Sequence, residues 1–273
     1  MTPLDTDAIS VVISTYQRPD ACERALRSVL EQSQSPLEVL VCDNGSTDDT
    51  ENRMRAWERR DERVHYLRTS QNTGTPGTTR NLGIEHARGA LIAFLDDDDE
   101  WLPSKLEAQL AAFADGSVDV IATNALRSDG SVYVTDAPPT LRPTRADLLR
   151  ANPIIVSSAL VARDRLISAG GFQTSRRVRG IEDYAMWLTL TGRGARLLVL
   201  GEPLVRYEDA SSDRMSMARI RTQVAVARLT WAHALQGPSS IAGIKGALKH
   251  SAGIGHLVGT RALVRLREHV RMR

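Results

Sequence analysis

"GALIAFLDDDDEWLP", residues 89–103, joins a short apolar run to four consecutive carboxylates, Asp96 to Asp99. Like charges crowded together cost free energy unless water, a cation or hydrogen-bond donors compensate them. This carboxylate run therefore indicates either a solvated turn or a metal site. The pattern of the chain on either side of the run distinguishes between the two.

The overall composition is that of an ordinary globular protein. The 273 residues are 42% hydrophobic and 25% charged, which suits one large domain or two small ones. A formal net charge of +2 does not favour nucleic acid as a partner. Cys22 and Cys42 match no zinc or redox spacing, so we expect small core residues in a reducing cytoplasm. The N-terminal stretch MTPLDTDAIS lacks a basic region followed by an apolar one, so no signal peptide is expected. No run approaches ~18 uninterrupted apolar residues, so no membrane-spanning helix is expected.

Short apolar, β-branched runs alternate with helical patterns along the first hundred residues. We expect strands at 8–14, 37–43, 63–68 and 91–95, and helices at 18–32, 46–60 and 78–89. This alternation predicts an α/β fold with a mostly parallel sheet flanked by helices.

Polar side chains follow three of the predicted strands at the point where each strand ends. Ser14 and Thr15 end the first strand, Asp43 and Asn44 end the second, and the carboxylate run follows the fourth. Because ligands bind outside the carboxyl ends of parallel strands, these three loops are expected to line one crevice. Carboxylates there can bind a hard divalent cation that keeps positions open for phosphate oxygens. The sequence therefore favours a metal site, with a diphosphate as a suitable substrate.

The chain resembles the family 2 glycosyltransferases with the GT-A fold in segments that follow the family's order. These are VVISTYQRPDACERALRSVLEQS, LEVLVCDNGSTDDT, TRNLGIEHARGALIAFLDDDDEWLP, and GGF followed by GIEDYAMWL, and together they cover about residues 8–210. The resemblance implies a GT-A (Rossmann-like) sheet and an inverting transferase. Such an enzyme moves a sugar from a nucleoside diphosphate donor to an acceptor hydroxyl, using a divalent metal, Mn or Mg.

The resemblance also implies roles for individual residues in the donor half. The expected nucleotide-sugar contacts are Ser14, Thr15, Asp43, Asn44, Arg80, Asp96 and Asp97. Asp98 is expected to bind the metal, and Asp97 to contact the ribose or the donor sugar. Asp96 assists, and Asp99 is expected to face solvent. Arg80, near the start of a predicted helix, either holds a donor oxygen bidentately or forms a surface ion pair.

A second acidic pair marks the acceptor half. Glu182 and Asp183 match the family's acidic pair at the start of a helix, which assigns Asp183 as the general base for the acceptor hydroxyl. The alternative is that the pair only favours the helix N-terminus. Trp101 is placed with Glu182 in the acceptor region. The Arg-rich stretch 176–179 is either a loop that closes over the diphosphate or a solvated loop.

Two positions depart from the family pattern. Asn44 stands where many members have a second Asp that pairs with the pyrimidine N3–H. An amide oxygen can accept the same hydrogen bond, so UDP- and dTDP-sugars are both expected donors. Glu208 and Asp209 stand where some relatives place a metal-binding histidine.

We divide the chain into a nucleotide-sugar-binding half (1–100), an acceptor-binding half (101–212) and a helical C-terminal extension (213–273). The basic segment 241–273 either lies peripherally on the inner membrane face, near a lipid-linked acceptor, or packs on the catalytic domain or a second subunit. A homodimer is one form of the latter. A cytoplasmic location fits both.

Two other function classes are compatible with the fold class. A sugar nucleotidyltransferase would make the activated sugar, but the chain has no N-terminal Gly-rich phosphate loop that ends in Arg and Lys. A non-catalytic nucleotide-sugar-binding module would have kept the fold without the reaction.

Overall fold

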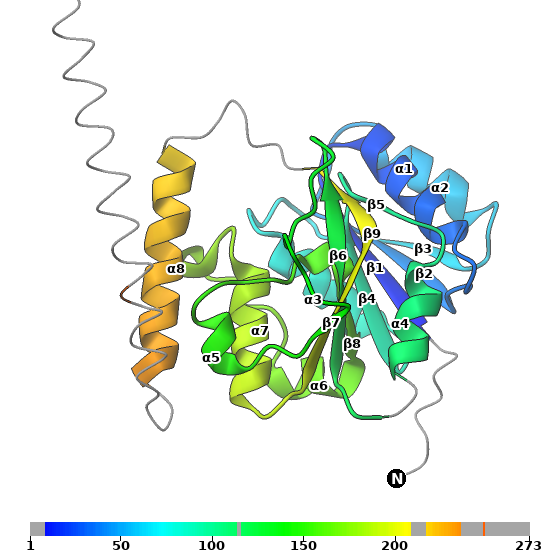
Figure 1. Ribbon diagram of the computed structural model, residues 1–273. Coiled ribbons are helices and arrows are strands. Elements are labelled where there is room, and N and C mark those ends of the chain that lie inside the picture. Colours follow the sequence, from blue (N-terminus) through cyan, green and yellow to red (C-terminus); the bar gives the residue numbers. More distant parts are fainter. Residues whose placement is uncertain (1–8, 114–115, 209–216, 236–247, 249–273) are drawn as a thin grey trace, which may run out of the picture.

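The computed structural model describes residues 9–113, 116–208, 217–235 and Leu248. The predicted alternation of strands and helices in the first hundred residues is confirmed (Figure 1). Its elements are β1 (Ile9–Thr15), α1 (Pro19–Leu30), β2 (Glu38–Asp43), α2 (Thr50–Glu58), β3 (Val64–Arg68), α3 (Pro76–His86) and β4 (Leu91–Asp96).

Two of these helices begin at places that the apolar pattern did not predict. α2 begins at Thr50 rather than at residue 46, because Ser46 folds back to donate both its backbone N–H and its hydroxyl to Asp43 Oδ1. α3 begins at Pro76, two residues early. Thr75 caps this helix by accepting the backbone N–H of Gly77, and proline at the first helical position needs no donor partner.

The second half of the chain completes the sheet and adds a helical layer. Its elements are β5 (Glu100–Trp101), α4 (Lys105–Phe113), β6 (Val120–Arg127), β7 (Thr140–Leu141), α5 (Arg145–Leu148), η1 (Val156–Ser158), β8 (Leu160–Ala162), α6 (Arg163–Ala169), η2 (Arg176–Val178), α7 (Glu182–Gly192), β9 (Leu197–Tyr207) and α8 (Met217–Leu235).

The described strands form one mixed, mostly parallel sheet in the order β3-β2-β1-β4-β8-β6-β9-β5, with β7 on β9. β1 to β4 are mutually parallel, and β8 enters antiparallel between β4 and β6. The register places Ser14 beside both Cys42 and Asp96, and Thr15 beside Asp43. The polar ends of β1, β2 and β4 therefore meet at one edge of the sheet, as predicted.

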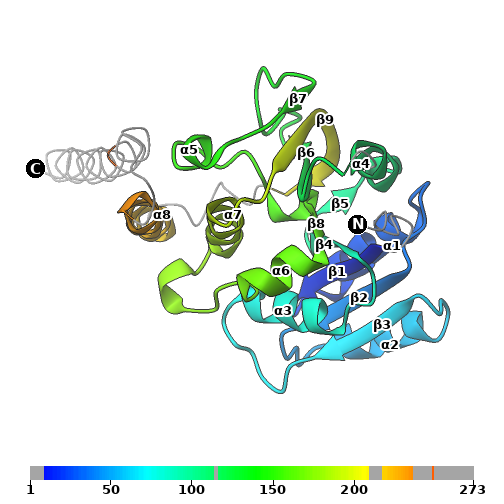
Figure 2. The same ribbon diagram turned by 90° about the horizontal axis from the view of Figure 1, so that it is seen from below.

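Helices cover both faces of the sheet, so the central strands are buried on both sides (Figure 2). One core includes Leu26 of α1, Met54 of α2 and Leu106 of α4, and the other includes Ile84 of α3 and Trp187 of α7. Alternate residues of each strand point into opposite cores, which is why the strands read as continuous apolar runs.

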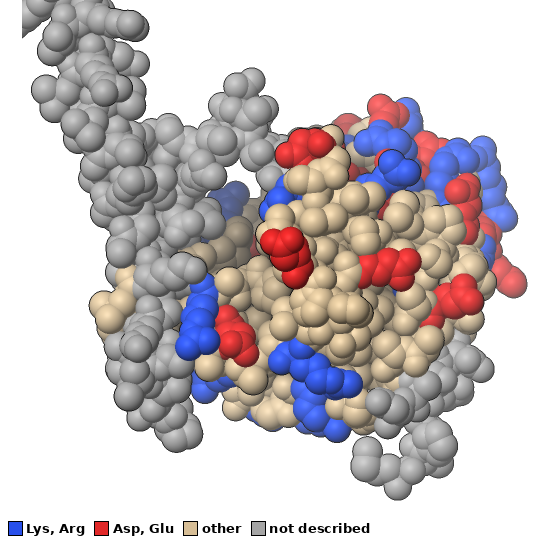
Figure 3. All heavy atoms as spheres, viewed as in Figure 1, with Lys and Arg blue, Asp and Glu red and all other residues tan. Residues whose placement is uncertain are grey.

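α8 lies beside α7 and α5 at one side of the molecule (Figures 1 and 2). It is tied there by Arg145, whose guanidinium donates to the backbone oxygen of His233 at 2.7 Å. The predicted basic segment 241–273 lies outside the described residues, apart from Leu248. No helix within the described ranges has the length and apolar character needed to cross a bilayer. On the face seen in Figure 3, the described basic and acidic side chains are interspersed around broad uncharged areas.

Candidate active site

Two cavities meet where β4 ends. The first, called here the β1 pocket, has a volume of about 430 Å³, and its lining includes Ser14, Thr15, Arg18, Asn44, Asp97 and Asp98. The second, the α7 pocket, also measures about 430 Å³, and its lining includes Arg80, Asp99, Tyr133, Asn152, Asp183 and Tyr207. Asp96 and Pro76 line both pockets, so the two cavities are adjacent.

The middle of the carboxylate run is compensated by one arginine. Nη1 of Arg18 lies 3.2 Å from Asp97 Oδ1 and 2.5 Å from Asp98 Oδ2. Asp97 also accepts a 2.7 Å hydrogen bond from the Thr15 hydroxyl at the end of β1. Burial nevertheless raises the pKa of Asp97 to about 6, because loss of hydration outweighs the contacts with Thr15 and Arg18.

The two ends of the run have different partners. Asp96 Oδ1 accepts a 2.6 Å hydrogen bond from Arg80. Asp99 is only 2% exposed and accepts the hydroxyl of Ser157 and the backbone N–H of Glu208. The expectation that Asp99 faces solvent is therefore wrong. Its burial, together with the negative charge of Asp96, raises the pKa of Asp99 to about 8. Its contacts tie the carboxylate run to η1 and to the end of β9.

The donor set of Asp97 and Asp98 fits a divalent ion that is shared with a phosphate group. Within the described part of the chain, no group of three or more His, Cys, Asp or Glu side chains is arranged to hold a metal alone. Mg²⁺ is commonly held by one or two carboxylates together with substrate phosphates. The two carboxylates already converge on a single cationic nitrogen of Arg18, which shows that they can face one positive charge.

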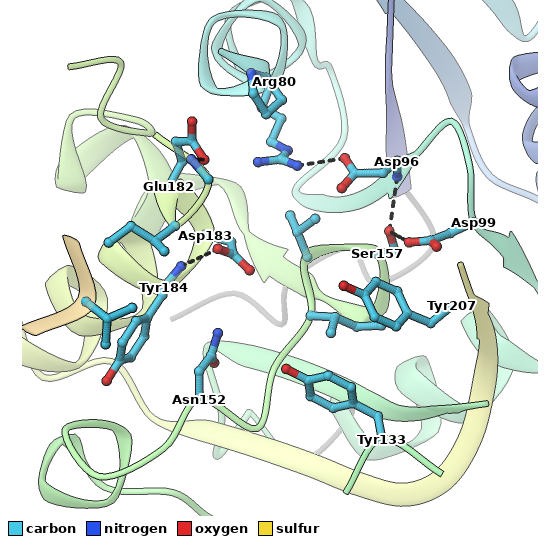
Figure 4. Close-up of a pocket in the computed structure, with 16 residues that line it drawn as sticks. Arg80, Asp96, Asp99, Tyr133, Asn152, Ser157, Glu182, Asp183, Tyr184 and Tyr207 are labelled. Carbon is cyan, nitrogen blue, oxygen red and sulfur yellow. Dashed lines mark hydrogen bonds and ion pairs between the residues drawn. The ribbon is translucent and has the colours of Figure 1, made fainter. Parts of the chain in front are cut away.

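Arg80 lies in the α7 pocket rather than in the β1 pocket (Figure 4). Arg80 is 4% exposed, and its guanidinium carbon lies 5.4 Å from the centroid of the Phe172 ring. Arg80 Nε is buried without a hydrogen-bond partner. The alternative of a surface ion pair is wrong, because the Arg80–Asp96 pair is buried on the arginine side. Arg80 thus places a positive charge between the carboxylate run and α7.

Asp183 points into the α7 pocket from the first turn of α7 (Figure 4). Its Oδ1 accepts the backbone N–H of Tyr184 at 2.7 Å. Burial raises the pKa of Asp183 to about 6, although the positive charge of Arg80 opposes the shift. A carboxylate with that pKa is ionised at neutral pH and basic enough to accept a proton.

Glu182 points away from the centre of the α7 pocket (Figure 4). It is 2% exposed, and its two oxygens accept the Thr75 hydroxyl at 2.6 Å and the Gly180 N–H at 2.8 Å. Glu182 therefore links Thr75, which caps α3 and lines the β1 pocket, to Gly180 just before the start of α7.

The wall opposite Asp183 is aromatic and polar (Figure 4). The Tyr133 and Tyr207 rings pack edge to face with centroids 5.7 Å apart, and Asn152 lines the same pocket. The sequence did not single out these three residues, because isolated Tyr and Asn positions in β-strands and loops carry no motif.

Comparison with known proteins decides the family. Residues 10–158 match the family model described as glycosyl transferase family 2. The chain belongs to this family.

Two relatives show how far the similarity to other family 2 glycosyltransferases extends. Putative teichuronic acid biosynthesis glycosyltransferase TuaG of Bacillus subtilis (strain 168) is 31% identical over 206 residues, or 73% of this chain and 78% of TuaG. UDP-Glc:alpha-D-GlcNAc-diphosphoundecaprenol beta-1,3-glucosyltransferase WfgD of Escherichia coli is 32% identical over 130 residues. That match covers 45% of this chain and only half of WfgD.

Solved structures agree on the fold of this glycosyltransferase. S. aureus TarS (residues 1–349) superposes with a TM-score of 0.69 at 17% identity, over 89% of this chain and 71% of that one. Mannosyltransferase PcManGT from Pyrobaculum calidifontis, in complex with GDP-Man and Mn²⁺, has a TM-score of 0.64 at 19% identity, over 97% and 82%. The predicted GT-A fold is confirmed.

Most of the donor contacts predicted for this glycosyltransferase line the β1 pocket, but Asp43 does not. Asp43 has no exposed surface, and its carboxylate accepts hydrogen bonds from Ser46 and from the Tyr66 hydroxyl. Asn44 does line the pocket. Its amide oxygen, however, already accepts the N–H and hydroxyl of Thr73 at 3.0 and 2.9 Å. Direct contacts of Asp43 and Asn44 with a nucleotide stay predictions.

The glycosyltransferase family pattern placed Trp101 in the acceptor region, but Trp101 reaches that region only through another residue. Trp101 is 4% exposed, and its indole N–H donates to the backbone oxygen of Ser157 at 2.7 Å. It does not line the α7 pocket but supports Ser157, which does.

The sequence also did not single out Thr75 and Arg18 as site residues. Thr75 had a readable signal, since a Thr directly before Pro is a typical start of a helix.

Proposed function

We propose that this chain is an inverting, metal-dependent glycosyltransferase that uses a nucleoside diphosphate sugar, a UDP- or dTDP-sugar. The nucleotide would lie in the β1 pocket and the acceptor hydroxyl in the α7 pocket. The observation that carries the proposal is that these pockets meet at Asp96 and Pro76. In this arrangement a leaving diphosphate in the β1 pocket and the carboxylate of Asp183 in the α7 pocket would lie on two sides of one reaction point.

In this reaction Asp183 acts as the general base. The acceptor oxygen attacks the anomeric carbon as its proton passes to the Asp183 carboxylate. A carbon–oxygen bond to the acceptor forms while the bond from the anomeric carbon to the diphosphate oxygen breaks, and the electron pair leaves with the diphosphate. Attack from the side opposite the leaving group inverts the configuration of the anomeric carbon.

The residues of the β1 pocket would hold the donor. Asp98, with Asp97 beside it, would hold a Mn²⁺ or Mg²⁺ ion, which supplies positive charge to the departing diphosphate. Thr15 holds Asp97 in place through its hydroxyl. Arg80 holds Asp96 between the two pockets and favours the ionised form of Asp183.

The choice of substrates to test comes from the relatives. WfgD and WfaP of Escherichia coli are named for transfer from UDP-Glc to GlcNAc-diphosphoundecaprenol, and TarS has been solved with UDP-GlcNAc. A sugar hydroxyl as acceptor also suits the α7 pocket, because Tyr133, Tyr207 and Asn152 offer aromatic edges and polar groups opposite Asp183.

The decisive experiment incubates the protein and MnCl₂ with UDP-glucose, UDP-GlcNAc or dTDP-glucose and a synthetic GlcNAc-diphosphate lipid. Mass spectrometry detects the product, and NMR assigns its anomeric configuration. An inverted glycoside product would support the proposal, and a retained configuration would contradict it. Nucleotide binding without transfer to any acceptor in a hydroxyl panel would favour the non-catalytic module. Pyrophosphate released from a nucleoside triphosphate and a sugar phosphate would favour the nucleotidyltransferase.

A further inference from the structure

Arg18 occupies an unusual place for a surface arginine. It stands directly before α1, three residues after Thr15 at the end of β1, and lines the β1 pocket. One of its nitrogens, Nη1, contacts both Asp97 and Asp98. These are the two carboxylates that the proposed function assigns to the metal ion. Arg18 therefore places a positive charge at the position that a divalent ion would need.

A guanidinium and a divalent ion cannot share this position without cost. Asp98 Oδ2 lies 2.5 Å from Arg18 Nη1, and a hard cation would lie at about 2.0–2.6 Å from a ligating carboxylate oxygen. Two positive centres this close to one oxygen repel each other. Metal binding to Asp98 would therefore require Arg18 to move.

Arg18 is free to move in a way that Arg80 is not. Its side chain is 54% exposed, whereas that of Arg80 is 5% exposed and enclosed beside Phe172. Arg18, Asp97 and Asp98 all line the β1 pocket. A diphosphate bound in that pocket would offer it new acceptor oxygens, and guanidinium groups bind phosphate oxygens in a bidentate manner.

We propose that Arg18 is an internal counter-ion, which compensates Asp97 and Asp98 in the ligand-free protein and passes to the donor diphosphate when metal and nucleotide bind. The proposal rests on the proposed function, because it requires a metal and a nucleoside diphosphate in the β1 pocket. It assigns to Arg18 two opposite effects. Arg18 weakens the binding of metal alone, and it strengthens the binding of nucleotide in the presence of metal.

The test measures both effects in the full chain with Arg18→Gln. Electron paramagnetic resonance of free Mn²⁺ gives the dissociation constant for Mn²⁺ alone, and calorimetry gives that for UDP at saturating Mn²⁺. We expect Arg18→Gln to bind Mn²⁺ alone about tenfold more tightly and UDP about tenfold more weakly, each equivalent to about 1.4 kcal/mol. Arg18→Lys keeps the positive charge, so its affinity for Mn²⁺ alone should stay near that of the wild type.

Arg24→Gln is the matched control. Arg24 lies on α1, the helix that Arg18 precedes, and also carries one exposed charge, but it pairs with Glu100 rather than with Asp97 or Asp98. It should bind Mn²⁺ and UDP like the wild type.

The opposite signs separate the proposal from simpler explanations. Weaker binding of both ligands by Arg18→Gln would mean that Arg18 only maintains the site, and no change in either would make Arg18 a bystander. Tighter Mn²⁺ binding with unchanged UDP binding would refute the passage to the diphosphate. Equal effects of Arg24→Gln would mean that the changes in affinity come only from the net charge of the protein. Each of these results would overturn the inference. A wild-type protein that binds neither Mn²⁺ nor UDP would overturn the proposed function itself, and this inference with it.

Discussion

Replacing Asp183 with Asn should sharply reduce transfer and at the same time make the protein more stable at alkaline pH. The pKa of Asp183 is raised from 3.8 to about 6, mainly by burial. This rise in pKa corresponds to about 3 kcal/mol, and this is an upper limit because the α7 pocket leaves the residue partly accessible. Asn is neutral and can still accept the Tyr184 N–H, so the substitution removes the charge with little change in shape.

The sign of the stability effect follows from linkage. Because the folded-state pKa lies above the unfolded-state value, the folded protein binds the proton more tightly. The cost of the ionised Asp183 is therefore fully present above about pH 6 and disappears below about pH 4. We expect Asp183→Asn to exceed the wild type in free energy of unfolding by up to about 3 kcal/mol at pH 8, with the difference shrinking on acidification.

The activity effect has a separate reason. Without an ionised carboxylate to accept the proton, turnover should fall by about 10²- to 10⁴-fold. The wild-type rate should itself decline as the pH falls through about 6, because Asp183 becomes protonated. UDP affinity should change little, since Asp183 does not line the β1 pocket.

Urea unfolding at pH 8 and pH 5, together with initial rates of UDP release, measures both effects. Asp164→Asn is the matched control, because exposed Asp164 also accepts the N–H of the following residue in the first turn of a helix. It should leave stability and rate unchanged. Turnover of Asp183→Asn within tenfold of the wild type would refute the role of base, and a less stable variant at pH 8 would refute the electrostatic reasoning.

Three further substitutions test other parts of the site and core. Thr75→Val removes the donor to Glu182 and the cap of α3, so kcat should fall by about tenfold, while Thr75→Ser should restore it; equal rates for both variants would argue against this link. Burial lowers the pKa of Lys105 well below its usual value, so its amine is protonated more readily in the unfolded chain than in the folded protein. Proton binding therefore favours the unfolded state, and the wild type loses stability as the pH falls. The Tm of Lys105→Met should therefore exceed that of the wild type by a larger margin at pH 6 than at pH 9. An equal margin at both pH values would contradict the idea that Lys105 is buried as a neutral amine. Gly171→Ala should lower the free energy of unfolding by more than Gly194→Ala, measured by urea titration, because both have positive φ but only at Gly171 would a Cβ lie 2.6 Å from a neighbouring oxygen. Equal losses of unfolding free energy in the two variants would show that the contact between a Cβ at Gly171 and its neighbouring oxygen is relieved without cost.

Much of the fold could be read from local pattern. The alternation of apolar runs with helical spacing predicted β1 to β4 and the helices between them, because strand and helix periods are properties of neighbouring residues. The first residues of α2 and α3 were missed because the side chain of Asp43 accepts the backbone N–H of Ser46 and the side chain of Thr75 caps α3.

The partners of the carboxylate run could not be predicted from the local sequence pattern. The sequence predicted that its charge needs compensation, and each carboxylate does have a partner, with Arg18 shared by Asp97 and Asp98. Arg80 for Asp96 lies sixteen residues away, whereas Asp98 is paired with Arg18, eighty residues earlier. The acidic run itself does not say which cation compensates which oxygen.

The sequence by itself determined the α/β class, the edge of the sheet at which polar groups gather and the family to which the chain belongs. Only the tertiary structure decided which side chains face one another: Glu182 with Thr75, 107 residues apart, and Asp99 with the backbone of Glu208, 109 residues apart. The physical reason is that periodicity records which face of a strand or helix is buried. The partner of a buried polar group depends instead on how distant elements pack.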